Sequence, residues 1–197
     1  MLVLQYKREY SKVGENMSDE KYELVKAFPK ELKEDTLRVL DMLNLKIRFS
    51  NCFEVHYKGS TLNIPERIYY DETSLSQNNS LTDRQQIILN CLFTRHNVGY
   101  VREENLKKII HHCSEYNWIV PYLMRLTGEY VIEILQVIKD NIGNLDKGII
   151  QEFIGENAGF YNTIESQIVS YWDCYYRSKY PVKTDYVGFV LIEYFRS

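Results

Sequence analysis

The amino-acid sequence predicts a mainly α-helical fold of stacked helical hairpins, with a small β-hairpin in the N-terminal region. Between residues 82 and 142, apolar side chains recur at helical spacing in four successive segments separated only by short turns. Between residues 47 and 69, apolar and polar side chains alternate instead, which is typical of half-buried strands. These two patterns together predict the fold class.

The N-terminal region is expected to begin with two short helices. The segment 18–28 offers Ser18 as an N-cap and acidic residues in its first turn, so the first helix is expected there. Pro29 suits a first helical position, and the apolar spacing that follows it predicts a second helix over 30–44.

A β-hairpin is expected to follow these helices. Phe53, Val55 and Tyr57 alternate with polar residues, and the segment 58–60 turns the chain before the second strand. Pro65 has no N–H group to donate, so it confines that second strand to an edge or a bulge.

Helical segments are expected from residue 82 onward. Thr82 and Gln85 form a capping box that opens the first of them, which is expected to end near His96. The others are expected at 100–113, 118–127, 128–142, 145–154, 160–178 and 183–195. The segment 128–142 is so rich in Val, Ile and Leu that we expect a central, largely buried helix there.

The polar stretch 71–80 is the best candidate for a linker, because it lacks apolar periodicity. It divides the chain into an N-terminal region with the β-hairpin, at 1–75, and a helical domain, at 80–197. The alternative is one continuous domain, and the length of 197 residues is compatible with either arrangement.

Composition narrows the class of function. The formal charge of −3 makes nucleic acid an unfavourable partner, because binding many phosphates needs an excess of Lys and Arg. No apolar stretch approaches the roughly 20 residues that span a bilayer, and the first ten residues hold no signal-peptide core. The four cysteines form no CxxC pair, so we expect reduced, mostly buried thiols in a cytoplasmic protein.

The first two helical hairpins start near residues 82 and 117, a spacing close to the length of one helical repeat. Val101 and Arg102, followed by Leu106, open the second helix of the first hairpin. This segment resembles the second helix of a HEAT-type repeat. The resemblance, over residues 82–142, implies a compact or HEAT-like array that serves as a scaffold for protein interaction.

Sequence motifs for chemistry are weak. His96 and His111 would lie on the order of 16 Å or more apart along a helix, so they cannot share a metal ion. Glu129 follows Arg125 by four residues, and an ion pair on one helix explains that acid without catalysis. We therefore expect no catalytic residue, no metal and no cofactor.

Four side chains bracket the turn at 97–99: Arg95, His96, Tyr100 and Arg102. Because a helix N-terminus carries partial positive charge, these side chains are candidates for binding a phosphate or an acidic side chain. The alternative is structural, with Arg102 pairing to Asp83, to Glu103 or to an acid of the neighbouring hairpin.

Eleven aromatic residues lie between 160 and 195, more than one helical face can conceal. Four of them are candidates for an interface: Tyr171, Trp172, Tyr175 and Tyr176. We therefore expect a non-enzymatic cytoplasmic interaction module, an adaptor or inhibitor, with a protein partner and possible self-association. The alternatives are an enzyme with a dispersed site, or a regulator that binds nucleic acid or anions through the basic residues near 97–99.

Overall fold

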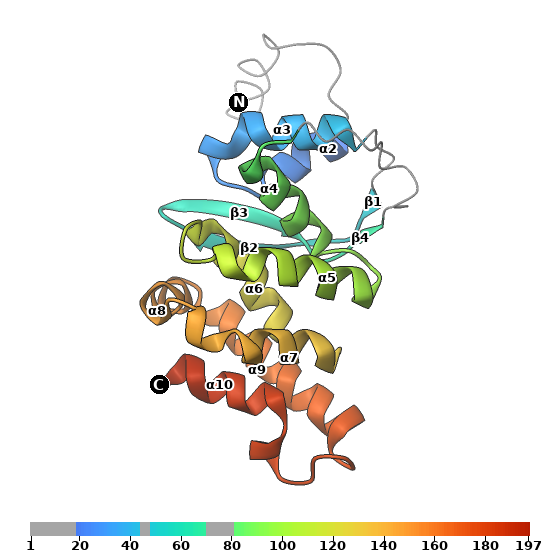
Figure 1. The fold of residues 1–197 in the computed structure, drawn as a ribbon, viewed down its shortest axis with the longest axis vertical. Helices are drawn as coiled ribbons and strands as arrows, with labels where there is room; N and C mark the ends of the chain where they lie inside the picture. The colour runs from blue at the N-terminus through green and yellow to red at the C-terminus, as the bar shows by residue number, and fades with distance from the viewer. Residues whose placement is uncertain (1–18, 44–47, 70–80) are drawn as a thin grey trace, which may run out of the picture.

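The structure is a computed structural model that describes residues 19–43, 48–69 and 81–197. It confirms the predicted class, a mainly α-helical fold with a small antiparallel β-hairpin near the N-terminus. Figure 1 shows the helices arranged in layers along the long axis of the molecule, from α2 and α3 at one end to α9 and α10 at the other.

The two predicted N-terminal helices are present but shorter than expected. Helix α2 spans Asp19–Val25 and α3 spans Lys33–Met42. A 3-10 turn at Lys30–Leu32 precedes α3, so the predicted helix over 30–44 is divided. The hydroxyl of Thr36 donates to the carbonyl of Leu32, which anchors the junction between the two pieces.

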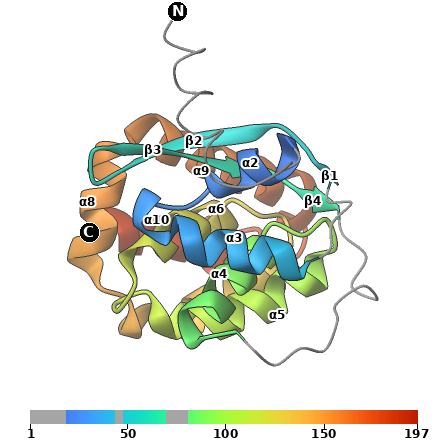
Figure 2. The same ribbon diagram turned by 90° about the horizontal axis from the view of Figure 1, so that it is seen from above.

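The predicted hairpin is confirmed as strands β2, Cys52–Tyr57, and β3, Ser60–Pro65. Lys58 and Gly59 between them have φ values of 46° and 74°. Positive φ at both central residues is the signature of the two-residue turn that matches strand twist. Figure 2 shows the hairpin along one side of the helices, with one end near α8.

The second predicted strand is divided after Pro65, because proline cannot continue the ladder. Strand β4, Ile68–Tyr69, pairs instead with β1, Arg48–Phe49. The N–H of Ile68 donates to the carbonyl of Arg95, so this small sheet is joined to the helical part of the chain.

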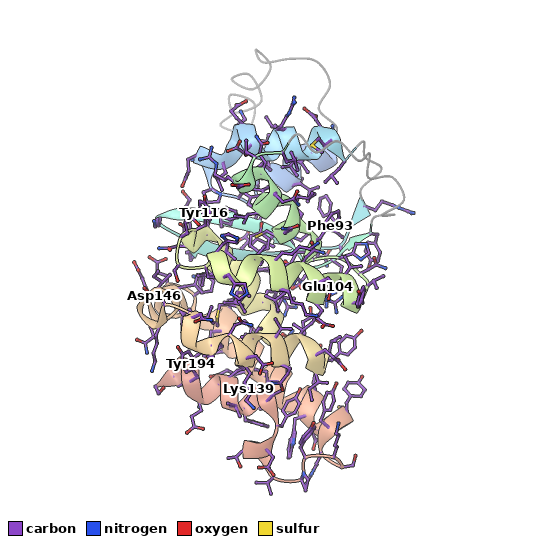
Figure 3. All side chains as sticks on the ribbon, in the orientation of Figure 1. Phe93, Glu104, Tyr116, Lys139, Asp146 and Tyr194 are labelled. Atoms are coloured by element: carbon purple, nitrogen blue, oxygen red, sulfur yellow. The ribbon has the colours of Figure 1, made fainter. Side chains whose placement is uncertain are left out.

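The first helical hairpin consists of α4, Asp83–Phe93, and α5, Gly99–Ile109. The capping box of Thr82 is present, with both of its hydrogen bonds. Helix α4 ends before His96, because the backbone of the following residues bridges to β4. Figure 3 places Glu104 on α5 and Tyr116 beyond its far end.

The second hairpin consists of α6, Val120–Thr127, and α7, Ile132–Asp140. The helix predicted at 128–142 is central, because α7 contacts α5, α6 and α10, but the prediction that it is largely buried was wrong. Helix α6 is the more deeply buried helix of this hairpin. Helix α7 buries only one side, and it begins four residues late because the stretch 128–131 is not helical.

The C-terminal part contains α8, Lys147–Glu156, α9, Ala158–Tyr171, and α10, Val187–Arg196. A single π-helical segment, Trp172–Tyr176, extends α9. Shorter 3-10 turns lie at Ile110–His112, Asn117–Ile119, Ile142–Asn144 and Lys183–Asp185. Helices α8, α9 and α10 correspond to the three helices predicted between 145 and 195.

One cluster of buried apolar side chains runs from Leu24 to Phe195 and includes members of both hairpin strands. The two regions predicted at 1–75 and 80–197 therefore share a core in their described parts. The predicted linker at 71–80 lies outside the described residues. Within the described ranges, no helix is long and apolar enough to cross a membrane.

Candidate functional site

A group of charged side chains fills the space where the β-hairpin meets the helices. We call it the arginine cluster, and its members are Glu66, Arg67, Arg95, Arg102, Arg125 and Glu129. They come from the β3–β4 connection, the α4–α5 turn, α5, α6 and the α6–α7 connection. The cluster therefore links segments that are far apart in the sequence.

Arg102 lies at the centre of this cluster, and only 1% of its surface is exposed. Its Nη2 donates to Glu129 Oε2 at 3.1 Å, and its Nη1 donates to the carbonyl oxygens of His96 and Asn97. The guanidinium thus holds the turn before α5 against the second hairpin. The sequence left open that Arg102 pairs with an acid of the neighbouring hairpin, and Glu129 is that acid.

Glu129 is almost fully buried and binds a second arginine. Its Oε2 accepts from Arg67 Nη2 at 3.0 Å, and the same nitrogen lies 2.9 Å from Oε1. The prediction that Glu129 pairs with Arg125 was wrong. Helix α6 ends at Thr127, so the two residues do not share a helix and the spacing of four brings no contact. Arg125 instead holds Glu66 Oε2 through two nitrogens, at 2.9 and 2.7 Å.

Arg95 is completely buried and binds mainly backbone. Its nitrogens donate to the carbonyl oxygens of Pro65 and Glu66, at 3.1 and 2.6 Å. Burial lowers the pKa of Arg95 to about 9, with Arg67 and Arg125 acting in the same direction and the two glutamates opposing them. The group stays charged at neutral pH, and its role is to join β3 to the end of α4.

The four residues of the predicted anion site do not lie together at the surface. Arg95 and Arg102 face the interior, and His96 is buried, with its Nδ1 accepting from the N–H of Val98. Tyr100 points away from them and is 70% exposed. The structure brings Arg95 and Arg102 to the same carboxylate, but it does not present them to solvent at the start of α5.

A second arrangement lies on the surface beside the arginine cluster. The rings of Tyr130, Tyr171 and Tyr175 contact one another, with centroid distances of 5.9, 6.2 and 6.5 Å. Tyr130 precedes α7, Tyr171 ends α9, and Tyr175 belongs to the π-helical segment. Tyr175 is 65% exposed, so the group is open to solvent on its outer side.

Further exposed apolar residues continue this group along one side of the molecule. Val98 and Tyr100 flank Gly99, and a Cβ atom on Gly99 would lie only 3.2 Å from Val131, the neighbour of Tyr130. Beyond them, the N–H of Asn97 donates to the carbonyl of Ile68, next to Tyr69. Figure 1 shows β4, the starts of α5 and α7 and the end of α9 along the same side. We call this surface the tyrosine face: Tyr69, Val98, Tyr100, Tyr130, Tyr171 and Tyr175.

The predicted interface aromatics divide between this face and its support. Tyr171 and Tyr175 belong to the face. Trp172 is buried, and its indole N–H donates to the carbonyl of Tyr180. Tyr176 is half-buried, stacks on Tyr186 and donates its hydroxyl to the carbonyl of Tyr130 at 2.7 Å. Tyr176 therefore supports the face from behind at Tyr130, whereas Trp172 is part of the interior.

Sequence reasoning missed Tyr69, Val98 and Tyr130 as surface residues and Glu66 and Arg67 as members of the cluster. Arg67 and Tyr69 flank buried Ile68 in an extended segment, and this alternation is a signal that could have placed them on one side. Nothing local distinguishes Tyr130 from the other tyrosines. Its role depends on contacts with Tyr171, 41 positions further along the chain.

The cysteines also differ from expectation. Cys91 and Cys113 are buried, and burial raises the pKa of both thiols, that of Cys113 to about 12. Cys52 and Cys174 are exposed, so the prediction of mostly buried thiols was wrong for half of them. Within the described ranges, no three His, Cys, Asp or Glu side chains gather as a metal site would require.

Comparison with known proteins gives no relative: no family model matches the chain, and neither the curated proteins nor the solved structures contain a match. The likeness to HEAT-type repeats thus rests on the spacing of the two hairpins and on Val101, Arg102 and Leu106. All three are buried, so they contribute to packing between the hairpins.

Proposed function

We propose that this protein is a non-enzymatic interaction module that binds a protein partner through the tyrosine face. The observation that carries the proposal is the clustering of exposed apolar side chains. Among the described residues, seven large apolar side chains are exposed, and five of these belong to the tyrosine face. Single exposed apolar residues need no explanation, but a contiguous group of them is typical of an interaction site.

The residue type supports the same proposal. Tyrosine provides a large contact area with little loss of conformational entropy, and its hydroxyl tolerates water before the partner arrives. Tyrosines are accordingly enriched among the residues that dominate binding energy. The hydrogen bond from Tyr176 to the carbonyl of Tyr130 holds this part of the face in a fixed geometry, which lowers the ordering cost of association.

The alternative of an enzyme with a dispersed site receives less support. An open groove lies between α9 and α10, with Val169 and Phe189 among its lining residues. The charged groups that face each other there are Glu165 and Arg196, joined by two hydrogen bonds of 2.7 and 2.6 Å. Because they neutralise each other, they favour a surface ion pair over a pair of acid and base catalysts.

The proposal places the protein in the cytoplasm. All four cysteines are free thiols in the structure, and two of them are exposed. Free exposed thiols are more compatible with a reducing compartment than with an oxidising one.

The test compares two matched variants of the full chain. The face variant carries Tyr130→Ser and Tyr175→Ser, and the control carries Val169→Ser and Val182→Ser, which are exposed elsewhere. Proteins that the parent retains from a lysate of the native cell are identified, purified and titrated by calorimetry against the parent, the face variant and the control. We expect the dissociation constant to rise by about tenfold or more for the face variant. Equal affinities for parent and face variant would refute the tyrosine face as the contact surface.

A further inference from the structure

Arg67 is the most exposed arginine of the arginine cluster, with 24% of its side-chain surface open, against 12% for Arg125 and at most 1% for the other two. Its backbone exchanges hydrogen bonds with Ser50, which continues the pairing of β1 with β4. Because side chains alternate along such a segment and Ile68 is buried, Arg67 and Tyr69 point to the same side. Arg67 therefore lies at the border between the cluster and the tyrosine face.

The contact with Glu129 also places Arg67 close to the other end of the face. Glu129 binds Arg67 directly, and Tyr130 is the next residue along the chain. Tyr69 is thus two residues from Arg67, and Tyr130 directly follows Glu129, which Arg67 binds. A partner that covers both rings would come close to the partly open guanidinium of Arg67.

The cluster carries more positive than negative charge. Among the described residues, four guanidinium groups share the carboxylates of Glu66 and Glu129, which leaves an excess of two positive charges. These groups are largely removed from water, where an unbalanced charge exerts a stronger field than it does in solvent. The lowered pKa of Arg95 has burial as its main cause, and the neighbouring arginines contribute to it.

Arg67 also has unused donor capacity. Its Nη1 donates to the carbonyl of Glu66 and its Nη2 to Glu129. A guanidinium has five N–H donors, and within the described parts of the chain no bond is made by Nε. A carboxylate from outside could therefore bind Arg67 without displacing Glu129.

We propose that the occupant of the tyrosine face is a protein segment that places an Asp or Glu side chain on Arg67 and apolar side chains over Tyr69 and Tyr130. This inference rests on the proposed function and adds the chemistry of the partner. The excess charge supplies the attraction for the carboxylate, and the rings supply the apolar contact area. A polyanion such as nucleic acid fits less well, because no guanidinium of the cluster is more than 24% exposed and the whole chain carries a charge of −3.

The test uses a phage library of random dodecapeptides, selected in parallel on the full-length protein and on the Tyr130→Ser, Tyr175→Ser variant. Peptides retained only by the parent depend on the face. We expect these peptides to be enriched in Asp or Glu flanked by aromatic or aliphatic residues. A synthetic peptide of this kind is then titrated by fluorescence anisotropy, together with a copy in which the acid is replaced by its amide.

The amide copy should bind the parent protein about tenfold more weakly, and raised salt should reduce this difference, because the lost contact is a charge-assisted bond. On an Arg67→Gln variant, acid and amide should bind within about twofold of each other. If Arg67→Gln lowers the melting temperature, Arg67→Lys is used in its place, because it keeps the charge next to Glu129. It should give an intermediate difference, because lysine lacks the planar fork.

Two kinds of failure are distinguishable. Peptides that depend on the face but show no preference for acids, or an acid preference that Arg67→Gln leaves unchanged, would overturn this inference and leave the proposed function standing. If the library yields no peptide that the parent retains and the face variant loses, the result counts against both the inference and the proposed function. Sedimentation of the parent alone reports a second copy of the chain as occupant: a dimer that the tyrosine variant loses would also overturn the inference.

Discussion

The arginine cluster and the tyrosine face are neighbours that reverse the usual distribution of residues. The cluster places charged side chains in the interior, with Arg95 fully buried, whereas the face places aromatic rings in water. The two regions meet at consecutive residues, Glu129 and Tyr130, and at Arg67 and Tyr69. Among the described residues, the most buried charges and the largest group of exposed apolar side chains thus lie next to each other.

The difference lies in whether each region finds its partners within the chain. Glu129 and Arg102 bind each other, and Arg102 and Arg95 also donate to backbone carbonyl oxygens. Buried ion pairs add little to stability compared with apolar packing, but they fix one arrangement of the segments that they join. The rings of Tyr130, Tyr171 and Tyr175 contact one another, and Tyr130 and Tyr175 remain exposed, so their outer surfaces are available to a second molecule.

The largest expected effect concerns the buried carboxylate. Glu129→Gln should lower the free energy of unfolding by about 3–5 kcal/mol, because Arg67 and Arg102 would lose their shared counter-charge in the interior. Denaturant titration measures the change. Glu133→Gln, exposed in the first turn of α7, is the control and should cost less than about 0.5 kcal/mol. A loss below about 1 kcal/mol for Glu129→Gln would mean that the cluster does not hold the hairpins together.

The thiols offer a second comparison of interior with exterior. Cys113 has a pKa of about 12 in the folded protein against an ordinary value of 9.0. Its contribution to the free energy of unfolding is therefore complete below pH 9 and is lost as the pH rises toward 12. The unfolded chain releases this proton first, so stability falls with rising pH. The parent should lose about 2 kcal/mol more than Cys113→Ala over the first 1.5 pH units or so above 9.

Denaturant titrations across this pH range measure the difference. Cys174→Ala removes an exposed thiol and should keep the pH dependence of the parent. Equal slopes for the parent and Cys113→Ala would show that Cys113 is accessible to solvent in the folded protein.

A smaller effect is expected behind the tyrosine face. Tyr176→Phe removes the hydrogen bond to the carbonyl of Tyr130 and should lower the free energy of unfolding by about 0.5–1.5 kcal/mol. Tyr175→Phe is the control, because its hydroxyl is exposed, and it should leave stability unchanged. Calorimetric melting of the two variants tests this. If Tyr176→Phe melts at the same temperature as the parent, this hydrogen bond does not hold the face in place.

The smallest expected effect is a gain in stability. Val98 is the N-cap of α5, has an extended backbone and provides no capping side chain. Val98→Ser should raise the free energy of unfolding by about 0.5–1 kcal/mol, because serine accepts from the first free N–H groups of the helix. Val169→Ser is matched in exposure, 42% against 46%, but lies within α9 and should give no gain. A gain in both variants would point to loss of exposed apolar surface as the cause.

Several elements were accessible from the sequence because their causes are local. The capping box at Thr82 and Gln85 depends on residues three positions apart, and the turn at Lys58 and Gly59 depends on the conformations that these two residues adopt. The periodic spacing of apolar residues also placed most helices to within a few residues. Each of these features is determined by neighbours in the chain.

The site was decided by the tertiary structure. The sequence located Arg102 and Tyr175 as candidates, but the pairing of Arg102 with Glu129 spans 27 positions, and that of Arg125 with Glu66 spans 59. Whether a charged or aromatic side chain faces solvent depends on which helix covers it, and that is settled only when all the helices pack. The sequence by itself therefore determined the helices and the hairpin, whereas the packing decided that the arginines are buried and that the tyrosines are exposed.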